Sequence, residues 1–303
     1  TLPEEHVSTE DNVSPSNDLT DAESFKAGQD QEQASILEKM RKKRAPTLYP
    51  PPTSFDYRLN SSCQSLTDVR HQLCGDCWAV ASAAAFSDIK CLYTGRNVYF
   101  SAKQLVSCVY TNKDGCGGGF PLDAAIYVRD NGIMTGGDPY TGEPYGCVTY
   151  GNIDYGMSCP VQCDNGQTMT PVKGNFIIIL SSSSRTCPMH VIAFEALHLV
   201  SGDVNMIQTY IFNYGPMVAS FDVYSDFEFA DPNGVYQHYS GGFNGTHAIR
   251  VMGWGTQNGV PYWLLANSWG TGFGNNGYIK FLRGSNHCGI ESSLVVMTPM
   301  EAK

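Results

Sequence analysis

The clearest hydrophobic pattern lies in residues 71–89, where a cysteine-glycine turn runs into an alanine-rich segment. Apolar residues recur there at steps of four, three and three residues: Ala79, Ala83, Phe86 and Ile89. This spacing predicts a helix that begins at or just before Cys77. Unpaired backbone N–H groups and the positive end of the helix dipole lie at such a position, and both favour a thiolate over a thiol.

Helices dominate the next part of the chain. Ser101 is suited to cap a second helix, and residues 122–128 predict a third short one. Residues 115–119 predict a loop, since four glycines in five positions would destabilise any regular element. Residues 135–174 are rich in Gly, Tyr and Cys without periodicity, and we expect a long looped region held by disulfides.

The second half changes to a pattern that is typical of strands. Aromatic and β-branched residues gather in short segments between turn signals, at 176–180, 191–200, 217–224, 247–254, 262–266 and 278–282. Residues 203–213 predict a helix capped by Asp203. Helices first and strands second indicate an α+β protein with two segregated lobes.

Residues 1–46 differ from the rest in composition. They are rich in acidic and uncharged polar residues, contain no cysteine, and end in the basic run Arg41-Lys-Lys-Arg44 before Pro46. One interpretation is a disordered acidic arm with a solvated basic run. The other is a removable prosegment whose processing point lies near that run, kept extended by the prolines that follow.

Composition excludes some classes of function. A formal charge of −10 argues against a nucleic-acid partner. The longest aliphatic run, at 176–180, is far too short to span a bilayer. The 11 cysteines indicate a secretory-route protein with several disulfides, and an odd total leaves at least one thiol without an intramolecular partner. Asn12, Asn60 and Asn244 each begin a glycosylation acceptor pattern, which also occurs by chance.

A cysteine nucleophile at Cys77 requires a base, and His247 is the best placed of seven histidines. His247 begins a predicted strand, and Asn267 follows the next one. If the two strands pair, Asn267 can bind one ring nitrogen of His247 and leave the other facing the thiol. That arrangement is a nucleophile, a base and a residue that orients the base.

Four motifs in this order together resemble the papain family of cysteine proteases. They are Cys74-Gly-Asp-Cys-Trp78, Gly115-Cys-Gly-Gly-Gly119, His247-Ala-Ile-Arg-Val-Met-Gly-Trp-Gly255 and Asn267-Ser-Trp-Gly270. The resemblance covers roughly residues 52–295. It is closer to the cathepsin B branch, on segments that include Phe221-Asp-Val-Tyr-Ser-Asp-Phe227 and His287-Cys-Gly-Ile-Glu-Ser292.

The resemblance implies a papain-like fold with the active site between two lobes. Residues 51–170 would form a mostly helical lobe and residues 171–303 a β-barrel lobe. Residues 1–50 would be a removable prosegment that inhibits its own enzyme by lying through the cleft. We expect a monomer that acts on protein and peptide substrates, with no cofactor or metal, in a lysosome, a vacuole or the secreted fraction.

The family also implies roles for individual residues. Cys77 would be the nucleophile, held as a thiolate by the imidazolium of His247. Asn267 would fix the ring tautomer, and Trp269 would shield that hydrogen bond from water. The Cys77 N–H and the Gln72 amide would form the oxyanion hole.

Two further features follow from the same resemblance. Gly118 and Gly119 would let a substrate backbone pair like an added strand, although a plain tight loop explains them as well. The disulfides Cys63–Cys91 and Cys74–Cys116 would brace the helix of the nucleophile, and Cys288 resembles a free thiol.

Three departures from the family pattern limit what can be inferred. The segment between Gln72 and Cys74 is one residue shorter than usual, so either Gln72 or His71 completes the oxyanion hole. No His-His pair occurs between residues 116 and 187, which predicts an endopeptidase without strong carboxydipeptidase activity. Ser293 stands where cathepsin B has a glutamate, which predicts a preference for apolar residues over arginine at P2, the second residue before the scissile bond.

Two other classes of function compete with this interpretation. Cys74-x-x-Cys77 at a helix start also suits a disulfide oxidoreductase or a metal site, but no flanking βαβ pattern and no second zinc-spaced pair accompany it. The shortened Gln72 segment leaves room for an inactive homologue that serves as a binding module.

Overall fold

The computed structural model describes residues 48–59, 62–110, 114–153, 155–169 and 203–297, and the backbone alone of 194–199 and 298–299. The chain divides into two compact units, Thr1–Pro46 and Thr47–Lys303, and the described residues all belong to the second. The strand expected at 176–180, and the acceptor patterns at Asn12 and Asn60, lie outside them.

Within the described residues, four α-helices form where the sequence predicts them. They are α2 (Cys77–Thr94), α3 (Ala102–Cys108), α4 (Pro121–Asn131) and α5 (Val204–Tyr214). The predicted caps are present, since the Ser101 side chain accepts from the N–H of Gln104 and Asp203 accepts from two N–H groups of α5. Short 3₁₀ turns occupy η1 (Tyr57–Leu59), η2 (Gln64–Leu66), η3 (Gly115–Gly117), η4 (Pro139–Thr141), η5 (Phe227–Phe229) and η6 (His287–Gly289).

The strands form one sheet in the order β2-β8-β3-β5-β6-β7-β4, with β1 paired to β5. Their bounds are β1 Phe55–Asp56, β2 Phe194–Leu199, β3 Met217–Tyr224, β4 Val235–Tyr236, β5 Phe243–Gln257, β6 Val260–Ala266, β7 Tyr278–Leu282 and β8 Leu294–Pro299. The pairs are antiparallel except β4 with β7. Together with the helices, this is the predicted α+β organisation.

The start of β5 differs from the sequence prediction. The predicted strand began at His247, where the apolar run begins, but β5 already begins at Phe243. A bulge lies in the pairing with β3 between Asp222 and Tyr224, and Tyr224 pairs with Phe243 beyond it. Backbone pairing does not require apolar side chains, so the polar residues before His247 also join the strand.

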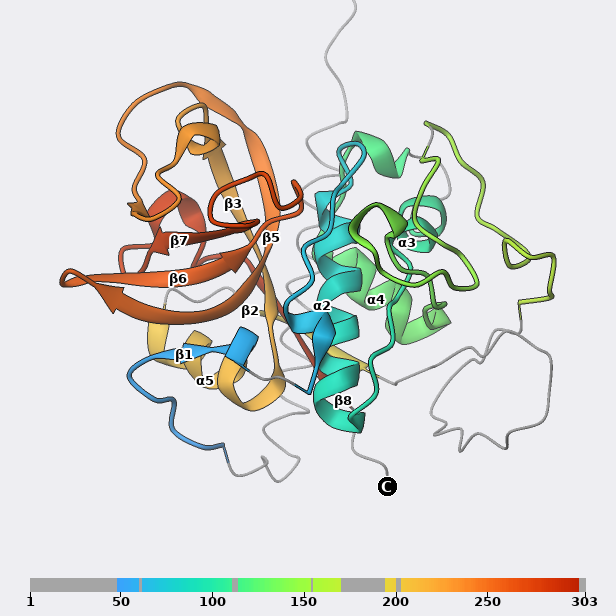
Figure 1. The fold of residues 1–303 in the computed structure, drawn as a ribbon, viewed down its shortest axis with the longest axis horizontal. Helices are drawn as coiled ribbons and strands as arrows, with labels where there is room; N and C mark the ends of the chain where they lie inside the picture. The colour runs from blue at the N-terminus through green and yellow to red at the C-terminus, as the bar shows by residue number, and fades with distance from the viewer. Residues whose placement is uncertain are drawn as a thin grey trace, which may run out of the picture. The chain divides into compact units, whose positions relative to one another are not determined.

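Helix α2 lies at the centre of the packing. It contacts α3 and α4 on one side and β5 on the other (Figure 1). It is buried on most of its surface, and its many alanines let neighbouring elements approach closely. Trp78 and Phe86 of α2 share one apolar core with Val218 of β3 and Ala248 of β5.

A buried ion pair joins α2 to β5. Arg250 Nη1 lies 2.5 Å from Asp88 Oδ2, and their side chains are 4% and 0% exposed. The guanidinium also donates to the carbonyl oxygens of Ser65 and Asp68. Arg250 lies on the same strand as His247 and Asp88 on the same helix as Cys77, so this contact links the two elements that carry the candidate chemistry.

Four disulfides hold the described chain. They are Cys63–Cys91, Cys74–Cys116, Cys108–Cys159 and Cys147–Cys163. The last two fasten the loop region predicted after residue 135. Among the described cysteines Cys77 and Cys288 are free thiols, and Cys187 lies outside the described residues.

Within the part of the chain that the structure describes, no helix combines the length and the apolar character needed to cross a membrane.

The Arg250–Asp88 pair yields a test of stability. Arg250→Met leaves the Asp88 charge buried without its partner, so we expect a loss of about 3–5 kcal/mol in the free energy of unfolding. Urea unfolding of the full chain carrying Cys77→Ala, which prevents self-cleavage, measures it. Arg129→Gln is the control, because its pair with Asp130 is partly exposed and should contribute about 1 kcal/mol or less. Equal losses in the two variants would contradict this role.

Candidate active site

Cys77 is the first residue of α2, as the sequence predicted. The N–H of Ala248, on β5, donates to its sulfur at 3.4 Å. Burial raises the pKa of the Cys77 thiol, the N–H of Ala248 lowers it, and the charge of Asp76 raises it again. The helix start therefore supplies stabilising donors, but burial and Asp76 outweigh them while the thiol has no charged base beside it.

Asp76 is the N-terminal neighbour of the thiol and is fully buried. The Tyr150 hydroxyl donates to its Oδ2 at 2.7 Å, while Oδ1 has no hydrogen-bond partner among the described residues. Burial raises the pKa of Asp76 to about 6, against the lowering effect of Tyr150. Asp76 is thus neutral in acid and becomes a negative charge beside Cys77 above about pH 6.

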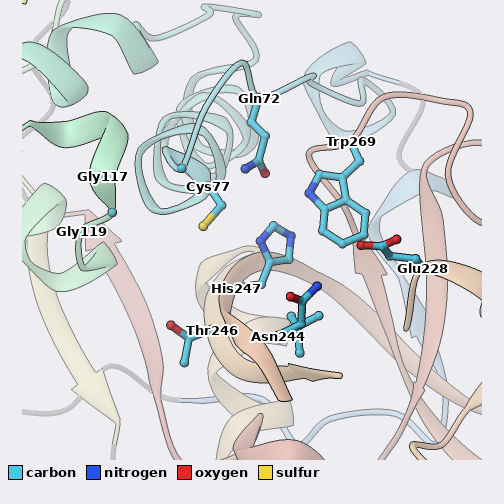
Figure 2. A pocket seen from close by; sticks show the side chains of 12 residues that line it. Gln72, Cys77, Gly117, Gly119, Glu228, Asn244, Thr246, His247 and Trp269 are labelled. Carbon is cyan, nitrogen blue, oxygen red and sulfur yellow. The ribbon is translucent and has the colours of Figure 1, made fainter. Parts of the chain in front are cut away.

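His247 and Asn267 come together through the predicted pairing of β5 with β6. The Nε2 of His247 lies 2.7 Å from Oδ1 of Asn267. The same Oδ1 accepts from the N–H of Ser268 at 2.8 Å, which identifies this atom as the amide oxygen. Nε2 must therefore carry the proton, and Nδ1 is left for the thiol, which lies next to the ring in Figure 2.

The histidine is enclosed by aromatic rings. His247 is 5% and Asn267 3% exposed. The ring of Trp269 lies 4.9 Å from that of His247, and the ring of Phe221 lies 5.9 Å away. Burial lowers the pKa of His247 to about 4, although the bond to Asn267 raises it. An isolated imidazole here would be neutral at neutral pH, so a charged one requires the thiolate as its partner.

Gln72 is held against the strand end that carries Asn267. The Ser268 hydroxyl donates to Gln72 Oε1 at 2.7 Å, and Gln72 Nε2 donates to the carbonyl of Cys74 at 2.8 Å. An amide nitrogen has two N–H groups, so one remains for another acceptor. Gln72 lines the same cavity as Cys77, whereas the exposed His71 is not among the lining residues.

A cavity of about 320 Å³ opens at these residues (Figure 2). Six of its lining residues are ones that the sequence had singled out: Gln72, Cys77, Gly118, Gly119, His247 and Trp269. The other six were not predicted as site residues: Gly75, Gly117, Val223, Glu228, Asn244 and Thr246. Ser293 is not among them.

Four of the unpredicted residues come from two segments of the chain, β3 with the turn after it and the start of β5. Val223 ends the buried part of β3, and Glu228 follows in the turn η5. Asn244 and Thr246 precede His247 on β5, where the sequence offered only a glycosylation acceptor pattern. If the strand had been predicted to begin at Phe243, the positions of Asn244 and Thr246 just before His247 would have indicated that both lie near the site.

The glycine loop beside Cys77 has structural reasons for its composition. Gly118 has φ +115°, a conformation that side chains rarely adopt. A Cβ on Gly119 would lie 2.5 Å from the ring of Trp78. The indole N–H of Trp78 also donates to the carbonyl of Gly115 at 3.0 Å. Tight packing on α2 therefore explains part of this loop independently of any ligand.

The redox and metal alternatives find no support in this geometry. Cys74 is bonded to Cys116, so it forms no disulfide with Cys77. In the described ranges no group of three or more His, Cys, Asp or Glu residues is arranged to hold a metal ion.

Comparison with known proteins agrees with the geometry. The model of the papain family cysteine protease matches residues 51–298. The chain is 38% identical over 255 residues to "Cathepsin B-like cysteine proteinase 4" of Caenorhabditis elegans, covering 82% of this chain and 75% of the relative. It is 34% identical to the "Gut-specific cysteine proteinase" of the same organism, covering 80% and 72%.

A solved structure is similar as well. The fold matches that of "proCathepsin B S9" from Trypanosoma congolense with a TM-score of 0.66 and 31% identity, covering 84% of this chain and 79% of that one.

The position of Asp76 generates a prediction on pH dependence. Asp76→Asn removes a negative charge beside Cys77, so the pKa of the thiol should fall. Because Asp76 is protonated in acid, the two proteins should differ above about pH 6 and converge below it. The measurement is the rate of iodoacetamide alkylation against pH, with peptide mass separating Cys77 from Cys288.

Asp130→Asn, which removes an exposed charge on α4, is the matched control and should leave the profile unchanged. Superimposable profiles of Asp76→Asn and the unaltered chain across the whole range would show that Asp76 does not influence the thiol.

Proposed function

This chain belongs to the papain family of cysteine proteases, and we propose that it is an endopeptidase whose nucleophile is Cys77. The observation that carries the proposal is the oriented His247. Its Nε2 is committed to Asn267, so its Nδ1 faces a thiol at the start of a buried helix. A cavity opens at that point, where a substrate carbonyl can reach the sulfur.

The first step is transfer of the thiol proton to Nδ1 of His247. Burial disfavours each charge alone, but the thiolate and the imidazolium compensate each other at close range. The thiolate then attacks the scissile carbonyl carbon, and the carbonyl electron pair moves onto the oxygen. The N–H of Cys77 and the second N–H of Gln72 stabilise that oxyanion, where loss of one donor typically costs about 3 kcal/mol.

The intermediate collapses with cleavage of the C–N bond. The Nδ1–H of His247 donates its proton to the departing amine, and a thioester remains on Cys77. Water then attacks the thioester with His247 as base, which releases the acid product and restores the thiol. Asn267 keeps the ring in one tautomer throughout, and Trp269 packs over it and limits access of water to that hydrogen bond.

The substrate backbone would run along Gly118 and Gly119. Both line the cavity, and a Cβ on Gly118 would meet nothing within 4 Å, so the loop leaves open space there. An extended peptide can pair with such a backbone as an added strand. The absence of a His-His pair between residues 116 and 187 supports cleavage within chains rather than removal of C-terminal dipeptides.

The P2 residue would lie near Ser293. The N–H of Ser220 donates to the Ser293 carbonyl at 2.9 Å, and Ser220 pairs with Ala248, whose N–H binds the Cys77 sulfur. The nearby carboxylate of Glu291 is 2% exposed and accepts bonds from the Trp263 indole. The carboxylate of Glu291 is therefore already hydrogen-bonded inside the protein and is not available to pair with a substrate. The uncharged Ser293 then favours an apolar P2 side chain.

Residues 1–50 would be a prosegment that keeps the enzyme latent. The basic run at 41–44 and the prolines after it supply a processing point, and a procathepsin B is among the similar structures. The disulfides suit a secretory route, which fits a lysosomal, vacuolar or secreted protease. The acceptor pattern at Asn244 lies on an exposed part of β5, but Asn244 also lines the catalytic cavity, where a glycan would obstruct the substrate.

Labelling tests the nucleophile and the latency together. The full chain is incubated at acidic pH under mild reduction with an epoxide that is selective for papain-like thiols, and peptide masses are read before and after loss of residues 1–50. We expect label on Cys77 only after that loss, and cleavage of an unlabelled test peptide at internal bonds. Cys288→Ser, which removes the other free thiol, should be labelled equally, and Cys77→Ala should not be labelled there.

An unlabelled but reduced Cys77 in both forms would contradict the peptidase and favour the inactive binding module. Release of successive C-terminal dipeptides would contradict the endopeptidase assignment.

The P2 prediction is tested with two peptides that differ only in Phe or Arg at that position. A neutral pocket gives no ion pair to arginine, so we expect kcat/KM to be at least about tenfold higher for the Phe peptide. Ser293→Glu should raise turnover of the Arg peptide several-fold by supplying the missing charge. Equal turnover of the two peptides by the unaltered enzyme would contradict the proposed role of Ser293.

A further inference from the structure

Glu228 brings a charge into the catalytic cavity that the proposed mechanism does not use. Among the described residues that line the cavity it is the only carboxylate, and none of them is Lys or Arg. Its side chain is exposed, and within the described residues no ion pair or hydrogen bond occupies it. It is therefore free to pair with a cation that enters the cavity.

The position of Glu228 assigns it to one side of the scissile bond. In Figure 2, Gly117 and Gly119 lie on one side of Cys77, and Glu228 lies beyond His247, beside Trp269. The departing amine must receive its proton from His247, so the substrate residue that follows the scissile bond, P1′, leaves past that ring. Its side chain then faces the part of the cavity that contains Trp269 and Glu228.

The turn that carries Glu228 is held on a rigid base. Phe227, just before it, is 0% exposed and packs its ring 5.6 Å from Trp269. Asp226 accepts from the Tyr236 hydroxyl at 2.8 Å and lies 3.0 Å from Nδ1 of His238. Despite burial, these hydrogen bonds lower the pKa of Asp226 to about 2, so it stays ionised and keeps its bonds in acid. The carboxylate of Glu228 is thus presented from a fixed backbone.

We propose that Glu228 makes this protease prefer lysine or arginine at P1′ and disfavour acidic residues there. The proposal rests on the peptidase function argued above. The stem and charged group of a Lys or Arg side chain can pack on the face of Trp269, and the charged group can then pair with the carboxylate of Glu228. Because Glu228 is exposed, the preference is moderate and weakens with salt.

Three quenched fluorescent peptides test it, identical except for Arg, Gln or Glu at P1′ and with an apolar P2. The full chain is activated in the same way for every variant, active sites are counted with the epoxide, and product masses verify the cleaved bond. We expect a ratio of kcat/KM for Arg over Glu of about tenfold, which falls to about twofold or less in Glu228→Gln. Glu228→Lys should invert it, and Asp130→Asn, a matched charge change on α4, should leave it unchanged.

The outcomes distinguish a failure of this proposal from a failure of the proposed peptidase function. Cleavage of all three peptides with the same ratio in Glu228→Gln and the unaltered enzyme overturns the role of Glu228 and leaves the peptidase intact. Failure to cleave any of the three contradicts the peptidase itself. A ratio that shrinks with added salt in the unaltered enzyme, but not in Glu228→Gln, supports the ion pair directly.

Discussion

The buried pair of Arg250 and Asp88 is the contact on which the arrangement of the site depends. The thiol is fixed to α2 and the imidazole to β5, and neither element specifies the other through its local sequence. A buried ion pair is poor in net stabilisation, but it tolerates few alternative geometries, because a displaced partner would leave a charge without compensation. It therefore constrains how α2 packs against β5, at a point about three helical turns along α2 from Cys77.

The electrostatics of the site follow from the same burial. Enclosure by Trp269 and Phe221 makes a lone charge on His247 unfavourable, and burial does the same to Cys77. In a site where Cys77 and His247 are each neutral alone, the two groups can be charged only as a pair. This would couple the proposed nucleophile to its proposed base more tightly than if both groups were exposed. Asp76 adds a second control on the thiol. Burial raises the pKa of Asp76 to about 6, so its negative charge beside Cys77 is absent in acid and present at neutral pH.

The sequence predicted the parts of this structure that depend on local rules. The start of α2 at Cys77 follows from the spacing of apolar residues, and the caps at Ser101 and Asp203 follow from hydrogen-bonding chemistry within a few residues. The pairing that brings His247 to Asn267 could be predicted because both lie on adjacent strands. Glu228 could not be predicted, since it lies in a turn whose direction depends on the burial of Phe227 among aromatic residues that are distant in sequence. Val223 lies on a predicted strand, but nothing in the sequence indicated that it faces the cavity. The early start of β5 was missed because backbone pairing leaves no apolar signature.

The turn at the start of α2 holds a free thiol and a disulfide-bonded cysteine three residues apart. Under the proposed mechanism Cys77 must remain a thiol, yet Cys74, in the same turn, is bonded to Cys116, which is only 3% exposed. The half-buried thiol faces the cavity, while the sulfur of Cys116 and the Cys63–Cys91 bridge are enclosed by the core. Burial therefore protects the Cys63–Cys91 bridge more fully than the Cys74–Cys116 bridge, because Cys74 is half-buried, as Cys77 is. The enclosed bridge can stay oxidised in surroundings that keep Cys77 as a free thiol.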